Sequence, residues 1–169
     1  MSAIAVFIGA PGSGKTKTGK RVAKALGVRH IDTDKVVVAA HGPIPQIFAE
    51  HGEAHFRRLE REAVAAALTE DAIVSLGGGA VLDPDTQADL ADVPVVLLTV
   101  TVDGIKARLS EDPDAVAKRP LLAGGIESWE RLVEARRPIY ERLADVVVDT
   151  SHRTFDSVAQ EVTEWLRQR

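Results

Sequence analysis

A glycine-rich segment near the N-terminus restricts the possible folds more than any other feature of this chain. Residues 9–16 read Gly-Ala-Pro-Gly-Ser-Gly-Lys-Thr and fit the spacing G-x-x-x-x-G-K-[ST]. An apolar, β-rich run over residues 3–8 precedes the segment, and a helical pattern over 15–26 follows it. Glycines in this setting let backbone N–H groups point at phosphate oxygens, and the helix N-terminus adds partial positive charge. The sequence therefore predicts a phosphate-binding loop, or P-loop.

The residues of this loop have distinct expected roles. Lys15 should reach the β- and γ-phosphates of ATP, and the Thr16 hydroxyl should bind Mg²⁺. The predicted nucleotide-binding residues in this region are Gly12, Ser13, Gly14, Lys15, Thr16 and Thr18. A chance match in a glycine-rich turn is the alternative, and the strand and helix on either side argue against it. The loop alone does not separate GTPases, motor or regulatory ATPases and metabolite kinases.

The rest of the chain alternates between strand and helix patterns. Further strands are predicted over 28–31, 72–76, 93–100 and 145–148, and helices over 102–110, 127–143 and 154–169. This alternation predicts an α/β, three-layer P-loop NTPase fold with a mostly parallel five-stranded sheet and helices on both faces. We expect a single domain over residues 1–169, with a helical substrate-binding insertion at about 33–60. The stretch at about 111–125, rich in proline and glycine, is expected to be a lid.

Composition excludes several classes of protein. The 169 residues include no cysteine, so disulfides and Cys-ligated zinc or iron–sulfur clusters are excluded. A net charge of −4 argues against general nucleic-acid binding. There is no apolar run long enough to span a membrane and no signal-peptide pattern, so we expect a cytoplasmic protein with no membrane partner.

Two carboxylates follow the second predicted strand. Asp32 and Asp34 lie at the carboxyl edge of a parallel sheet, where ligands bind in doubly wound folds. This position suits a kinase that acts on a small hydroxyl compound, with Asp32 holding the Mg²⁺ hydration shell and Asp34 binding the acceptor hydroxyl and receiving its proton. The alternative is that Asp-Thr-Asp is a turn and N-cap for the next helix.

Other polar residues and glycines suit an anionic substrate. On a helix, Glu53, Arg57 and Glu60 share one face, so that the arginine is held in place while it grips a carboxylate. The alternative is an exposed ladder of ion pairs. Gly77, Gly78 and Gly79 end a buried strand and could bring backbone N–H groups close to a small ligand, although a tight turn would look similar.

The positions of two arginines favour a role for each in binding an anionic group. Arg119 lies in the expected lid and could stabilise charge on the transferred phosphoryl group. Arg136 lies on the helix that follows, where it could meet a second anionic group. For either arginine alone, an ordinary surface position is the simpler interpretation.

Taken together, these motifs make the chain resemble the shikimate kinase family over essentially its whole length. The matching segments occur in family order: residues 9–16, Asp32-Thr33-Asp34, Ile47-Phe48, Gly52-Glu53-x-x-Phe56-Arg57-x-x-Glu60, Gly77-Gly78-Gly79-Ala80, Arg119-Pro120-Leu121-Leu122 and Arg136-x-Pro138-x-Tyr140.

The resemblance implies phosphoryl transfer from MgATP to the 3-hydroxyl of shikimate, in the pathway to chorismate and the aromatic amino acids. It implies that Asp34 meets the reacting hydroxyl and that Arg57 and Arg136 bind the shikimate carboxylate. The backbone of 77–79 would line the substrate site. Thr16 and Asp32 would serve Mg²⁺, and Lys15 and Arg119 would serve catalysis. Arg108 and Arg153 would lie at the adenine, and the protein is expected to act as a monomer.

The chain also departs from the family pattern. The linker at residues 42–48 is one residue shorter than expected, and Pro43 should change how the helix at 45–50 begins. The approach to the lid is long and acidic, and Lys17 stands where a small hydroxyl residue is common. A gluconate-type or nucleotide-type kinase, or a regulatory nucleotide switch, remains as an alternative function.

Overall fold

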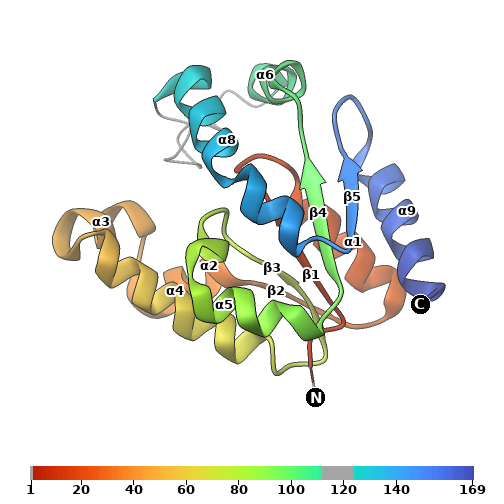
Figure 1. Cartoon of the computed structure of the whole chain (residues 1–169), viewed down its shortest axis with the longest axis horizontal. Coiled ribbons are helices and arrows are strands. Elements are labelled where there is room, and N and C mark those ends of the chain that lie inside the picture. The colour runs from red at the N-terminus through yellow and green to blue at the C-terminus, as the bar shows by residue number, and fades with distance from the viewer. Residues whose placement is uncertain (1, 112–123) are drawn as a thin grey trace.

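A computed structural model describes residues 2–111 and 124–169 (Figure 1). Its centre is a five-stranded sheet in the order β2-β3-β1-β4-β5, in which every neighbouring pair is parallel. The strands are β1 (Ala5–Gly9), β2 (Arg29–Asp32), β3 (Ala72–Ser75), β4 (Val95–Thr99) and β5 (Val146–Asp149). The predicted α/β fold with a five-stranded, mostly parallel sheet is confirmed, and all four strand pairings are parallel.

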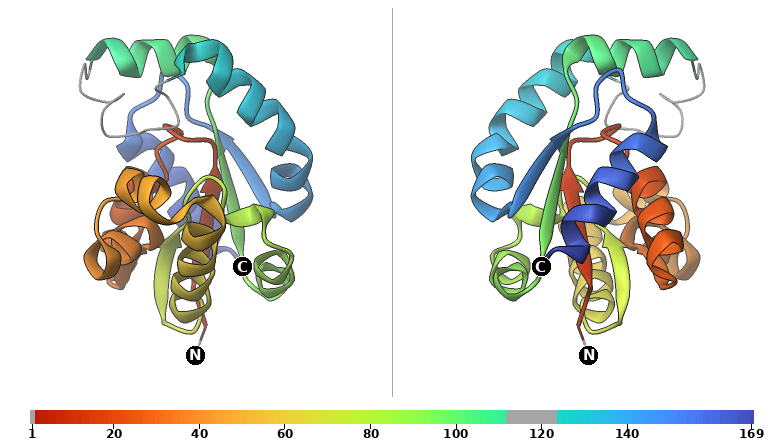
Figure 2. Two further views of the ribbon diagram at one scale, coloured as in Figure 1. Left: turned by 90° about the vertical axis from the view of Figure 1, so that its left-hand side faces the viewer. Right: turned by 90° about the vertical axis from the view of Figure 1, so that its right-hand side faces the viewer.

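Helices cover both faces of this sheet (Figure 2). On one face, α1 (Lys15–Leu26) and α9 (Phe155–Arg167) pack against a cluster that includes Val22 and Val158. On the other face, α4 (Glu53–Ala67) and α8 (Gly125–Leu143) pack against a cluster that includes Val64 and Tyr140. Strands β1, β3 and β4 are buried between these layers, as their continuous apolar sequences predict.

The ends of the helices follow from the local sequence. Helix α1 ends at Gly27, whose φ of 71° is a left-handed C-cap conformation. Helix α2 (Thr33–His41) begins at Asp32, whose side chain accepts the backbone N–H groups of Asp34 and Lys35. Helix α6 (Val102–Glu111) follows β4.

The region predicted as a substrate-binding insertion contains α2, α3 (Ile44–His51) and the first half of α4. A small separate cluster of Val37, Ile47, Phe56 and Ala63 holds these helices together. Helix α3 begins at Ile44, with Pro43 at its N-cap and no side-chain capping bond. The helix thus begins one residue before the predicted 45–50, directly after Pro43, whose φ of −57° is the angle that the proline ring imposes.

The segment between β3 and β4 contains short elements that the sequence did not predict. These are η1 (Ala80–Leu82), α5 (Pro84–Asp89) and η2 (Leu90–Asp92). Asp83 caps α5 by accepting the N–H groups of Asp85 and Thr86. None of the helices in the described part of the chain combines the length and the apolar character needed to cross a bilayer. The predicted lid falls almost entirely outside the described residues.

Candidate active site

The P-loop curls between β1 and α1, and several distant elements hold it. Lys15 Nζ donates to the carbonyl oxygens of Gly9 and Ala10, at 2.8 and 3.0 Å. Trp129 of α8 is buried and donates its Nε1–H to Pro11 O at 2.8 Å. At Gly14, where φ is 95°, a Cβ would lie 2.5 Å from the ring of Phe155. Contacts from α8 and α9 therefore help to define the shape of the loop.

Two predicted magnesium residues lie together beside this loop. Thr16 Oγ1 donates to Asp32 Oδ2 at 2.6 Å. The other oxygen of Asp32, Oδ1, accepts the backbone N–H of Asp34 at 3.0 Å and of Lys35 at 3.3 Å. Asp32 is therefore a helix cap, as the alternative interpretation held, and also the partner of Thr16. A hydroxyl and a carboxylate are the hard oxygen ligands that suit Mg²⁺, so these residues fit the ion.

Asp34 lies in the first turn of α2, half-buried, and faces the glycines after β3. A Cβ on Gly77 would lie 2.5 Å from Asp34 Oδ1, so this close approach requires glycine. Burial raises the pKa of the Asp34 carboxyl, and the charge of Asp32 raises it further. The charges of Lys15 and Arg57 oppose this rise. Asp34 is thus a carboxylate whose affinity for a proton exceeds that of an ordinary aspartate.

Arg57 is held as the sequence predicted. It donates to Glu60 at 2.8 Å and lies 3.4 Å from Glu53. Burial alone would lower the pKa of Arg57, but Glu60 and Glu53 more than offset it and the net shift is upward. For Glu60, which is buried, burial outweighs Arg57 and the pKa of the carboxyl is raised. A Cβ on Gly79 would lie 2.5 Å from Arg57 Nη1, so the guanidinium fork lies against the glycine turn.

Arg136 comes to the same turn from the other side, on α8. It is 6% exposed, and its Nη1 has no hydrogen-bond partner among the described residues. A Cβ on Gly78 would be 3.4 Å from that atom. The neighbouring Tyr140 donates its hydroxyl to Gly78 O at 2.6 Å, and burial raises the pKa of Tyr140. A buried guanidinium nitrogen without a partner is costly, so this position suits an anionic ligand.

The structure therefore brings together residues that are far apart in the sequence. The P-loop, Asp34, Arg57, Arg136 and the turn 77–79 meet at the carboxyl ends of β1, β2 and β3. Arg119, the predicted lid arginine, lies outside the described residues.

The predicted adenine residues lie on the far side of the P-loop. Arg108 donates to Gly12 O at 2.6 Å and to Thr150 O at 2.8 Å, and its guanidinium lies 5.1 Å from the centre of the Phe155 ring. Arg153 reaches Ser157 Oγ at 3.0 Å. Both arginines line an open cavity of about 620 Å³ together with Phe155.

Sequence reasoning missed Phe155, since a lone phenylalanine at a helix start resembles an ordinary core residue. Its ring also lies 5.3 Å from Lys17 Nζ. The grouping of cationic side chains around this ring, beside the P-loop, indicates a role for Phe155. That grouping arises only in the folded structure, so no sequence pattern could have revealed it.

Two other predicted nucleotide residues are buried. Ser13 and Thr18 are both 0% exposed, and among the described residues neither hydroxyl has a partner. Their proposed contact with nucleotide stays a prediction. Gly12 packs against α6, where a Cβ would lie 2.3 Å from Ile105 Cδ1.

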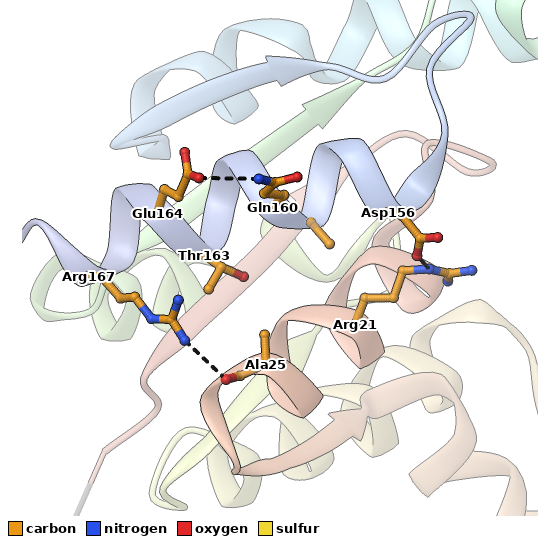
Figure 3. A pocket seen from close by; sticks show the side chains of 8 residues that line it. Arg21, Ala25, Asp156, Gln160, Thr163, Glu164 and Arg167 are labelled. Atoms are coloured by element: carbon orange, nitrogen blue, oxygen red, sulfur yellow. Dashed lines mark hydrogen bonds and ion pairs between the residues drawn. The ribbon is translucent and has the colours of Figure 1, made fainter.

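A second hollow lies between α1 and α9, away from these residues (Figure 3). Charged side chains that line it have partners within the hollow: Arg21 pairs with Asp156 at 2.7 Å, and Arg167 donates to Ala25 O at 3.2 Å. None of the predicted site residues lines this hollow. The candidate active site is therefore the sheet edge, where the predicted residues meet.

Comparison with known proteins agrees with this geometry. Residues 11–167 match the family profile described as shikimate kinase. The chain is 43% identical over 171 residues to a shikimate kinase of Mycobacterium avium, covering 98% of this chain and 94% of the relative. It is 45% identical over 175 residues to one of Salinispora arenicola, covering 98% and 99%.

Solved structures give the same result. A shikimate kinase from Acinetobacter baumannii in complex with shikimate has a TM-score of 0.87 at 25% identity, covering 99% of this chain and 94% of that one. A gluconokinase from Sinorhizobium meliloti, with a TM-score of 0.64 at 18% identity, shares the fold. The profile match and the full-length relatives establish that this chain belongs to the shikimate kinase family.

Proposed function

We propose that this protein transfers the γ-phosphoryl group of ATP to the 3-hydroxyl of shikimate, giving shikimate 3-phosphate and ADP. The observation that carries the proposal is Arg136 Nη1, a buried cationic nitrogen without a partner among the described residues. It faces the same glycine turn as Arg57 and Asp34. A small carboxylic acid with a hydroxyl group satisfies all three, since its carboxylate pairs with the arginines and its hydroxyl meets the aspartate.

In this proposal the chemistry follows from positioning. The acceptor oxygen attacks the γ-phosphorus, the bond to the β–γ bridging oxygen breaks, and ADP leaves. The hydroxyl proton passes to Asp34, whose raised pKa favours its acceptance. Lys15 and the backbone N–H groups of the P-loop stabilise the phosphate charge, because phosphoryl transfer depends mainly on alignment and electrostatics.

Thr16 and Asp32 are proposed to hold Mg²⁺, which neutralises charge on the phosphates when bound. Arg119 is proposed to add a positive charge from the lid. We also propose that the protein works as a monomer in the cytoplasm. The cytoplasm is proposed because ATP is supplied there.

The test is a coupled assay of ADP release with and without shikimate. Strong stimulation by shikimate, and much less by gluconate or by a nucleoside monophosphate, is the expected result. Gluconate is included because a gluconokinase shares this fold. Slow ADP release that shikimate does not change would instead favour a regulatory nucleotide switch, and stimulation by gluconate would favour the other kinase.

A further inference from the structure

A chain of hydrogen bonds reaches the P-loop through two side chains, His30 and Ser75, to which the function proposed above gives no role. His30 Nε2 lies 2.9 Å from Ser75 Oγ, and Ser75 Oγ donates to the carbonyl oxygen of Lys15 at 2.8 Å. Ser75 is 1% exposed and ends β3, while His30 lies in β2. The chain therefore connects two strands of the sheet to the residue that begins α1.

The direction of each bond follows from the number of hydrogens available. A serine hydroxyl has one hydrogen, and that of Ser75 is used by the Lys15 carbonyl. Towards His30, Ser75 Oγ must accept, so Nε2 of the imidazole carries the hydrogen. His30 acts as a donor that orients the serine, and the serine orients Lys15.

The surroundings leave little freedom for another arrangement. A Cβ on Gly19 of α1 would lie 2.6 Å from Ser75 Oγ and 2.8 Å from His30 Nε2, so the helix lies directly against both groups. Loss of the histidine donor would leave a buried hydroxyl with an unused acceptor, next to the backbone that begins α1.

A second contact from the same strand acts on the next residue of the loop. Side chains alternate along a strand, so His30 and Asp32 point to the same face of β2. Asp32 accepts the hydroxyl of Thr16 at 2.6 Å, while His30 acts through Ser75 on Lys15. Strand β2 thus holds two consecutive residues of the P-loop, one by a direct contact and one by a relay.

We propose that His30 is a positioning residue for nucleotide binding: through Ser75 it fixes the Lys15 carbonyl, and so the direction in which the first turn of α1 presents Lys15 and Thr16. The inference rests on the P-loop part of the proposed function and not on the identity of the acceptor.

The experiment measures binding of MgADP by calorimetry, with no shikimate present, and then the KM for ATP. His30→Leu and Ser75→Ala should each weaken MgADP binding and raise the KM for ATP by roughly two- to tenfold, the loss expected for one neutral hydrogen bond. The KM for shikimate should not change. His30→Gln should bind like the unmodified protein, since its amide N–H can replace Nε2–H.

Controls separate positioning from general damage. His41→Leu changes an exposed histidine in the last turn of α2 and should leave binding unchanged. The double variant of His30→Leu and Ser75→Ala should lose little more than either single variant, because both break the same relay.

Unchanged MgADP binding in His30→Leu, or equal loss in His30→Gln, would overturn the proposal. Should His30→Leu fail to fold, Ser75→Ala decides, because it removes one buried oxygen and little volume. Binding of MgADP is measured without an acceptor, so an error in the assigned acceptor does not affect this result.

Discussion

Asp34 lies in a site that disfavours its own charge. Burial and the neighbouring Asp32 raise its pKa above the usual value, so the ionised carboxylate destabilises the unliganded native state at neutral pH. The stability associated with the protonated form is present at low pH and is lost as the pH rises through the folded-state pKa. The charge is retained, in our proposal, because the acceptor hydroxyl needs a proton acceptor.

Asp34→Asn is therefore expected to lose most turnover and yet to unfold at a higher temperature than the unmodified protein at pH 7.5. Asparagine resembles the protonated carboxyl, so this gain should shrink as the pH falls towards the pKa of Asp34. Initial-rate assays and thermal unfolding from pH 4 to 8 measure the two effects. Near-full turnover, or lower stability at pH 7.5, would contradict the proposed role.

Arg136 and Arg137 are adjacent in the sequence and differ in environment. Arg136 is buried with an unpartnered nitrogen among the described residues, whereas Arg137 is exposed and pairs with Glu134. Arg136→Met should raise the KM for shikimate by about ten- to a hundredfold, the loss expected for hydrogen bonds to a charged group. Arg137→Met is the matched control and should leave it unchanged. Equal effects in steady-state kinetics would show that Arg136 has no special role.

At the scale of elements, the turn after β3 connects the substrate residues. Gly77 lies against Asp34 and Gly79 against Arg57, each so closely that a methyl group would displace the side chain. Neither glycine has a positive φ, so added alanine acts by occupying space and not by straining the backbone.

Gly77→Ala should therefore lower kcat, while Gly79→Ala should mainly raise the KM for shikimate. The effect of Gly79→Ala should be largely lost when Arg57 is already alanine, since the methyl group acts through that side chain. Steady-state kinetics of the single and double variants measure this. If the effects of Gly79→Ala and Arg57→Ala on the KM for shikimate were fully additive, Gly79→Ala would not act through the Arg57 side chain.

The boundaries of most elements followed from local signals in the sequence. Gly27 ends α1, Asp32 begins α2, and the proline and glycine breaks at 42–45 and 52 separate α2, α3 and α4. No helix was predicted over residues 80–92, because the helices there are only one or two turns long. Such short helices do not show the repeating spacing of apolar residues that identifies a helix in a sequence. Tertiary contacts, more than local preference, define such short elements.

At the scale of the whole molecule, the parallel sheet accounts for how much of the site was predictable. Ligands bind at the carboxyl ends of such strands, so Asp34 and the turn 77–79 could be assigned to one edge from sequence. Contacts across the fold could not be assigned. Trp129 donates a hydrogen bond to Pro11, which lies 118 residues away in the sequence. Phe155, at the start of α9, packs against Gly14, which precedes α1. No local sequence pattern encodes either contact.

The stability of the whole molecule should also respond to pH through His30. Burial lowers its pKa in the folded state, and Lys20 and Lys35 lower it further against the opposing charge of Asp32. The unfolded chain then binds more protons as the pH falls below about 6.5, the ordinary pKa of histidine, so the native state loses stability in that range.

His30→Gln keeps a hydrogen-bond donor but cannot be protonated, so it should lose less stability than the unmodified protein between pH 7.5 and 5. The free energies of unfolding from urea titrations at several pH values should agree near pH 7.5 and separate below about 6.5, with the variant higher. His41→Gln, which changes an exposed histidine outside the relay, is the control and should follow the unmodified protein. Parallel curves for His30→Gln and the unmodified protein would show that His30 keeps an ordinary pKa. In that case its charge state, unlike its hydrogen bond to Ser75, would have no bearing on stability.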